Sequence, residues 1–333
     1  MRNKILEVQK LGFPWHTSDP FLFCVHHEDY YPEGNENMGP TKGYEGRLIG
    51  NDFTIKDGYR MYHGRKVPGF PAHPHCGFET VTVVRKGLVD HSDSMGAAGR
   101  FGFGDVQWMT AGRGVQHCEM FPLKNKDKPN TLELFQIWLN LPKASKLVDP
   151  HFKMLWSEDI PVITKNGVTV ELIAGEMFEQ KAPEPAPNSW AANPQNEIAI
   201  MNIKMDPNSK FTLPSVSSNT NRTIYLYRGK SITVDGIEIN NYHLAKLKAD
   251  ENVEIGNGNE EVWILLLQGK PINEPVFQHG PFVMNHKHEL IEVIDRYQKD
   301  EFGGWPWQSP ENVHDRDSGR FALHSDGKKE VKS

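Results

Sequence analysis

The chain of 333 residues contains 37 Lys and Arg against 43 Asp and Glu, which gives a formal net charge of −6. This balance argues against a broad basic surface for nucleic acid, so direct nucleic-acid binding is not expected. No stretch approaches about 20 apolar residues and the N-terminus has no apolar run typical of a signal peptide, so we expect no membrane association. Three cysteines do not make a disulfide framework, which favours the reducing cytoplasm.

The length leaves room for two domains of ordinary size. Residues 1–145 are expected to form the first, beginning with the alternating segment KILEVQKLG and the apolar run DPFLFCV. Residues 28–69 are polar, Gly-rich and weakly periodic, and we interpret them as an insertion. A loop this long inside a compact domain is usually functional or disordered. Because it leads directly to His73, we expect it to lie over the mouth of any site there.

A histidine-rich segment carries two pairs of potential metal ligands, His73 with His75 and His117 with Glu119. Residues two apart on a β-strand share a face of that strand. Short strands punctuated by glycine separate the pairs, and an antiparallel meander would bring them face to face. Three imidazoles and one carboxylate suit a divalent transition metal. Glu79 is a second-choice carboxylate, more typical of a strand residue that hydrogen-bonds nearby.

Aromatic side chains flank these ligands in sequence and could form the apolar wall of a substrate pocket, although each is also consistent with ordinary barrel core. The candidates for this wall are Phe70, Phe78, Trp108 and His63. Cys76 and Cys118 each follow a candidate ligand directly, so alternation points them away from a metal. We interpret both as small buried hydrophobic residues, the alternative being a redox-sensitive pair on the outer face.

The second half of the chain repeats the pattern of short strands. Residues 146–196 are interpreted as a connecting segment with a hairpin around Asn166-Gly167, a dipeptide typical of tight hairpin turns. Residues 197–270 then predict a second barrel. Aligning Gly87 with Gly229 places serines where His73 and His75 stand in the first half. The second barrel should therefore lack metal ligands, and one metal per chain is expected.

The C-terminal segment, residues 271–333, contains one predicted helix, HKHELIEVIDRYQKD, with Asn285 as its candidate N-cap. Its apolar residues recur at helical spacing, and they are Leu290, Ile291, Ile294 and Tyr297. The motif His286-x-His288-Glu289 is discounted as a metal site, because residues two apart on a helix do not face each other. Trp305 and Trp307 are expected to dock on the barrel, and the last seven residues to be loose.

Several motifs together carry a resemblance: HPH-x-GFETVT, HSDS, GDVQWMTAGRG and H-x-E-M-x-P, with PINEPVFQHGPFVMN near the C-terminus. They resemble the signature of the pirin family within the cupin superfamily. The resemblance implies an all-β fold of two tandem cupin (double-stranded β-helix, jelly-roll) barrels with a short C-terminal helix. It also implies that His73, His75, His117 and Glu119 are the metal ligands. The insertion resembles that of a longer bacterial branch of the family.

Three His and one Glu leave two positions open on a six-coordinate metal, which suits a non-haem Fe(II) centre that binds O2 and substrate. Zinc held by four protein ligands would instead be structural, and manganese, nickel and cobalt stay open. The family resemblance implies a dioxygenase-like oxidoreductase of the quercetinase type. Its substrate would be a flat aromatic or enolic small molecule, and Glu119 could serve as ligand and transient base. The alternative is an iron-dependent redox-sensing binding protein without turnover. The sequence does not indicate a protein partner.

Overall fold

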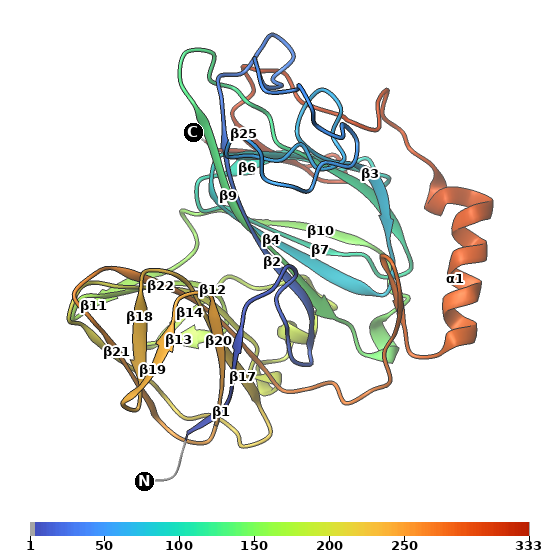
Figure 1. Ribbon diagram of the computed structural model, residues 1–333. Coiled ribbons are helices and arrows are strands. Elements are labelled where there is room, and N and C mark those ends of the chain that lie inside the picture. Colours follow the sequence, from blue (N-terminus) through green and yellow to red (C-terminus); the bar gives the residue numbers. More distant parts are fainter. Residues whose placement is uncertain (1–3, 333) are drawn as a thin grey trace. The chain divides into compact units, whose positions relative to one another are not determined.

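The computed structural model describes residues 4–332, and these divide into two compact units (Figure 1). We name the first the histidine unit, and it comprises residues 26–136, 143–157 and 274–332. We name the second the aliphatic unit, and it comprises residues 4–25, 137–142 and 158–273. Strands dominate both units, as predicted, and α1 (Lys287–Asp300) is the one α-helix within the described residues. No helix among residues 4–332 is long and apolar enough to cross a membrane.

The histidine unit is built on a six-stranded sheet and a five-stranded sheet. The larger sheet has the order β26-β25-β6-β5-β8-β3, and the smaller has the order β10-β7-β4-β9-β2. In Figure 1, β6, β25 and β3 lie in one layer and β4, β7 and β10 in another. The larger sheet consists of β3 (Gly69–His75), β5 (Leu88–Asp93), β6 (Ala98–Gly102), β8 (Val115–Met120), β25 (Arg320–Leu323) and β26 (Lys329–Lys332). The smaller consists of β2 (Phe21–Tyr31), β4 (Phe78–Lys86), β7 (Val106–Thr110), β9 (Asn130–Asn140) and β10 (His151–Leu155).

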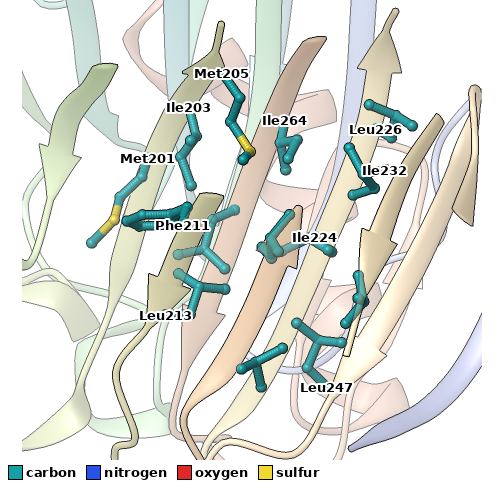
Figure 2. Packing of buried hydrophobic residues seen from close by; sticks show 14 of the residues in the cluster. Met201, Ile203, Met205, Phe211, Leu213, Ile224, Leu226, Ile232, Leu247 and Ile264 are labelled. Carbon is teal, nitrogen blue, oxygen red and sulfur yellow. The ribbon is translucent and has the colours of Figure 1, made fainter. Parts of the chain in front are cut away.

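The aliphatic unit pairs a seven-stranded sheet, β1-β20-β17-β22-β15-β12-β11, with a four-stranded sheet, β16-β21-β18-β19. The larger consists of β1 (Ile5–Lys10), β11 (Val162–Lys165), β12 (Val168–Ala174), β15 (Ala199–Met205), β17 (Asn221–Arg228), β20 (His243–Leu247) and β22 (Val262–Gly269). The smaller consists of β16 (Lys210–Leu213), β18 (Ser231–Val234), β19 (Ile237–Asn240) and β21 (Val253–Asn257). Alternate residues along these strands point inward. They form one cluster of buried aliphatic, Met and Phe side chains (Figure 2).

Two of the predicted domain assignments need correction: residues 1–145 as one barrel, and residues 146–196 as a connecting segment. The first strand does not belong to a barrel of residues 1–145, because β1 pairs with β20 of the aliphatic unit, with Val8 opposite Ala245. The hairpin at Asn166-Gly167 forms, and both residues have positive φ, as a type I′ turn requires. It is not part of a connecting segment, however, since β12 pairs with β15. Its buried apolar residues thereby reach the core cluster of the aliphatic unit.

The C-terminal residues return to the histidine unit. β25 pairs with β6, and β26 pairs with β25, so the prediction of a loose end is wrong as far as Lys332. A buried ion pair anchors the segment before these strands: Arg100 donates to Asp90 at 2.6 and 2.7 Å and to the His314 carbonyl oxygen at 2.9 Å. Trp307 docks as expected, because its indole N–H donates to the Asp93 carbonyl oxygen at 2.8 Å.

Helix α1 begins one residue later than predicted. The N-cap is His286 rather than Asn285, because the Glu289 carboxylate accepts from the backbone N–H of His286 at 2.9 Å. Leu290 and Val293 are the buried residues of the helix, whereas Ile291 is 50% exposed, contrary to the predicted apolar face. The helix packs against β24 (Phe282–Met284), which pairs with β23 (Phe277–His279).

Candidate metal centre

Strands β3 and β8 bring the two predicted ligand pairs together. They run antiparallel with His73 opposite His117, and with Phe70 opposite Glu119. A bulge between Phe70 and His73 shifts the register within β3. The strands approach closely at Gly69, where the Cβ of any other residue would overlap the Glu119 carbonyl oxygen.

The three histidines form a compact cluster. One ligand nitrogen from each of His73, His75 and His117 lies within 4.8 Å of the others. The ring centroids are 4.5 Å apart for His73 and His117, and 4.8 Å apart for each of the other two pairs. His75 and His117 are buried, whereas His73 is half-buried. The cluster is therefore most accessible to solvent on the side of His73.

Burial keeps these imidazoles neutral, which is the form that binds metals. Desolvation lowers the pKa of His73 to about 4, and it holds the pKa values of His75 and His117 well below their usual range. His73 Nδ1 lies 2.8 Å from the Pro71 carbonyl oxygen. Since a carbonyl only accepts, Nδ1 carries the proton and the lone pair is on Nε2.

His117 gives a direct test of whether the site fits a metal. Both of its ring nitrogens are buried and lack a hydrogen-bond partner among the described residues. A buried polar group left in this state costs about 1–3 kcal/mol. A metal ion bound to one nitrogen would offset that cost, so the donor set fits a divalent metal with affinity for imidazole.

Glu119 lies beside this cluster rather than within it. One of its carboxylate oxygens is 3.9 Å from His117 Nε2. The Thr82 hydroxyl donates to the other oxygen at 2.8 Å, and the Gln136 amide donates to Oε2 at 3.2 Å. Burial raises the pKa of Glu119 to about 7, and the two hydrogen bonds act in the opposite direction. The carboxylate is therefore held close to the histidines and is poised to gain or lose a proton near neutral pH.

Glu79 and Trp108 lie on the other face of the smaller sheet. Since Thr82 points to Glu119, alternation along β4 turns Val81 and Glu79 away from it. Glu79 instead accepts from the Thr110 hydroxyl at 2.7 Å. Trp108 pairs directly with Val81 and so shares its face. The interpretation of Trp108 as part of the pocket wall therefore needs correction.

Phe70 and Phe78 lie against the histidines as the pocket interpretation expects. The Phe78 ring centroid is 5.1 Å from that of His75, and the Phe70 centroid is 6.3 Å from that of His73. His63 is exposed, and its ring lies 5.9 Å from that of Phe70. These two phenylalanines form an apolar boundary on two sides of the cluster, with His63 beyond Phe70.

The insertion is shorter than expected, because β2 extends to Tyr31 and β3 begins at Gly69. Its last part packs near the cluster through Tyr62, whose ring centroid is 5.0 Å from that of Phe70. The Tyr62 hydroxyl donates to Asp29 at 2.6 Å and lies 2.7 Å from His27 Nδ1. The structure thus places Tyr62, near the end of the insertion, against Phe70, which in turn lies against His73.

Sequence reasoning missed His91 and Asp93 on β5, which lies next to β8. In the sheet register Asp93 is opposite His117 and His91 is opposite Glu119. His91 Nε2 lies 3.1 Å from an Asp93 carboxylate oxygen, and its ring centroid is 5.4 Å from that of His117. The His-x-Asp spacing is the same signal as His-x-His, and it could have identified this pair.

Cys76 and Cys118 are both fully buried. Burial raises the pKa of Cys76 to about 11 and that of Cys118 to about 12. Thiols with such values carry almost no thiolate at neutral pH and react slowly. The structure therefore favours the interpretation of both as small buried hydrophobic residues.

Two β-barrel units, one with a buried three-histidine cluster beside a carboxylate, define a two-domain cupin protein with a candidate metal centre. Comparison with known proteins agrees: residues 15–139 match the pirin family model and residues 200–303 match the model of the pirin C-terminal cupin domain. Human pirin is 36% identical over 238 residues, which cover 70% of this chain and 77% of the relative. The chain therefore belongs to the pirin family, and the predicted pair of tandem cupin barrels is confirmed.

Two further relatives carry a quercetinase name. A Pseudomonas aeruginosa protein, provisionally named a quercetin 2,3-dioxygenase, is 34% identical over 236 residues, covering 70% of this chain and 79% of the relative. The crystal structure of a quercetin 2,3-dioxygenase from Acinetobacter baumannii has a TM-score of 0.71 at 26% identity. That match covers 90% of this chain and 98% of the solved chain. The chain is thus similar to pirins and to quercetinase-like members of one family.

Proposed function

We propose that the chain is a metal-dependent, dioxygenase-like oxidoreductase that acts on a flat aromatic or enolic small molecule with O2. The observation that carries this proposal is the buried cluster of three neutral imidazoles with Glu119 beside it. The names of two relatives as quercetin 2,3-dioxygenases support the substrate class. The three free cysteines support a reducing location such as the cytoplasm.

One divalent metal, Fe(II) in this proposal, would be held by nitrogen atoms of His73, His75 and His117 and by a carboxylate oxygen of Glu119. Four protein ligands on a six-coordinate ion leave two positions, and an ion of this kind supplies a place where O2 and substrate meet. Zinc, manganese, nickel and cobalt are also compatible with these ligand types.

The residues around the cluster have separate tasks in this proposal. Glu119 serves as a ligand and as the transient base that takes a proton from a substrate hydroxyl and returns it later. Thr82 and Gln136 hold its carboxylate in place. Phe70 and Phe78 exclude water from two sides of the histidines. Substrate would approach from the side of His73, where the cluster is least buried.

The test begins with elemental analysis of protein purified without added metal. Anaerobic reconstitution with Fe(II) and an oxygen-electrode trace with quercetin follow. About one iron per chain and O2 uptake that His117→Ala abolishes would support the enzyme. Stoichiometric zinc without O2 uptake would indicate a structural site instead. Bound iron without turnover of quercetin or other flavonols would favour a redox-sensing binding protein.

A further inference from the structure

The insertion carries an exposed histidine, His63, near its C-terminal end. His63 directly follows Tyr62, which is buried, adopts a left-handed φ of 57° and is anchored to Asp29 by its hydroxyl. Backbone hydrogen bonds join Tyr62 and Asp52 in both directions, at 2.8 and 2.9 Å. Non-glycine residues in the left-handed region are uncommon and often occur at functional sites.

A backbone carbonyl group fixes the tautomer of His63. His63 Nδ1 lies 2.9 Å from the carbonyl oxygen of Gly50, which comes shortly before Asp52. A carbonyl only accepts, so Nδ1 carries the hydrogen and Nε2 carries a lone pair. The side chain is exposed, and Nε2 is therefore an acceptor available to a ligand.

Aromatic rings connect His63 to the candidate metal centre. The His63 ring makes edge contacts with Phe53, at a centroid distance of 4.9 Å, and with Phe70, at 5.9 Å. Phe70 also lies against His73, the least buried ligand of the cluster. Phe53 is 40% exposed, so part of its ring faces solvent. One aromatic ring therefore separates His63 from the metal ligands, on the side open to solvent.

We propose that His63 is a specificity-determining residue whose Nε2 accepts a hydrogen bond from a hydroxyl on the distal ring of an aromatic substrate. Phe53 and Phe70 supply the apolar surface along which the rings of that substrate lie. The proposal rests on the proposed function for the identity of the substrate class. It adds a recognition element that belongs to the insertion of this chain rather than to the two barrels.

Equilibrium binding tests this role apart from turnover. The probes are quercetin and galangin, two flavonols that differ only in the two hydroxyls of the distal ring of quercetin. Each is titrated anaerobically into the metal-loaded full chain, and quenching of tryptophan fluorescence gives Kd. Wild-type protein should bind quercetin about three- to tenfold more tightly than galangin, the ratio typical of one hydrogen bond.

Three variants separate the hydrogen bond from packing. His63→Phe keeps a ring but removes the acceptor, so the quercetin preference should fall to near one while galangin binding is retained. His63→Gln restores an acceptor and should recover part of the preference. His279→Phe is the matched control, since His279 is exposed on β23 of the same unit, and it should leave the preference unchanged.

The outcomes distinguish this proposal from the proposed function. A wild-type preference near one, no binding of either flavonol, or a preference that survives in His63→Phe would overturn the role of His63. O2 uptake with quercetin that is unaffected by His63→Phe would leave the enzyme in place and remove only this recognition element. A preference that depends on His63 without any O2 uptake would support the recognition element and contradict the dioxygenase.

Discussion

The two barrels of this chain share one architecture but differ in the side chains that line their interiors. In the aliphatic unit, residues such as Ile203 and Leu226 fill the space between the sheets with apolar side chains (Figure 2). In the histidine unit, the corresponding kind of space holds His75, His117 and Glu119, all buried. Within residues 4–332, the one group of three metal-binding side chains belongs to the histidine unit. The strands of a cupin barrel therefore enclose an interior space. The residues that point inward determine whether that space is a hydrophobic core or a binding site.

The difference has an energetic consequence. Burying one aliphatic side chain contributes about 1.5–3 kcal/mol to folding. A buried imidazole without hydrogen-bond partners, as in His117, costs free energy instead. The histidine unit thus gives up stability at the positions that carry its chemistry, and a bound metal should restore it.

The largest expected effect is the loss of metal on replacement of His117. His117→Leu should lower the metal content of the purified protein about tenfold or more, because one of three clustered nitrogen ligands is removed. The metal-free variant should be as stable as the metal-free wild type, or more stable by about 1–3 kcal/mol, because a buried unpaired imidazole becomes an apolar side chain. Elemental analysis and urea denaturation measure the two effects. Full metal occupancy in the variant would contradict the assignment of His117 as a ligand.

In the aliphatic unit, a substitution in the core is expected to lower the stability of the fold and leave the metal content unchanged. Ile203 is fully buried on β15 within the apolar cluster, so Ile203→Ala should reduce the free energy of unfolding by about 2–5 kcal/mol. Metal content should not change. Ile237→Ala on β19 is the matched control, because Ile237 is 45% exposed and its replacement should have little effect. Loss of metal in Ile203→Ala at a temperature where the protein stays folded would refute the separation of core from site.

How much of this could be predicted from the sequence depends on whether a feature is local. The period of two along a strand placed His73 with His75, and the glycine turns suggested that His117 would meet them, as the register of β3 and β8 shows. The same period gives relative faces only, and a shift of one residue exchanges them. For that reason the sequence alone offers Trp108 as a candidate for the pocket wall, and only the register of β7 on β4 shows that it shares the face of Val81.

The sequence pattern does not predict which strands pair when they lie far apart in the chain. Neither β1 nor β25 contains a signal that indicates its partner strand, and each pairs with a strand formed by residues far away in the chain. Strand propensity predicts that such segments pair, but the open edge available to them is a property of the folded barrel. The pair His91 and Asp93 has the same spacing as His73 and His75, which marks it as a candidate, but only the register of β5 on β8 shows that it lies beside His117.

A moderate effect is expected from pH. Burial raises the pKa of Glu119 to about 7, so the residue is mainly protonated below that pH and mainly a carboxylate above it. His73, whose pKa is lowered to about 4 by burial, stays neutral across this range. Metal affinity should therefore rise about tenfold between about pH 6 and pH 8. Competition titrations with a chelator measure the rise. The Glu119→Gln variant should bind the metal more weakly and should lose most of the rise in affinity with pH. An equal rise in that variant would show that another group is responsible.

The smallest effect is expected at Glu79, and it decides which carboxylate serves the site. Glu79 is as deeply buried as His117 and stands four residues after His75, so position in the sequence alone makes it a rival to Glu119. Alternation along β4 turns it to the other face, where it accepts from the Thr110 hydroxyl. Glu79→Gln retains the shape and an accepting oxygen.

The Glu79→Gln variant should therefore keep the metal affinity of the wild type within about a factor of two, since no ligand is removed. Glu119→Gln, the same chemical change on the face of the histidines, should weaken binding in the same titration. The two variants carry the same chemical change, one on a side chain that faces the histidines and one on a side chain that faces away. Comparing them thus separates the effect of a lost ligand from that of a lost buried charge. If Glu79→Gln lost metal while Glu119→Gln kept it, the carboxylate ligand would lie on β4, and the inward face of the histidine unit would have to be reassigned.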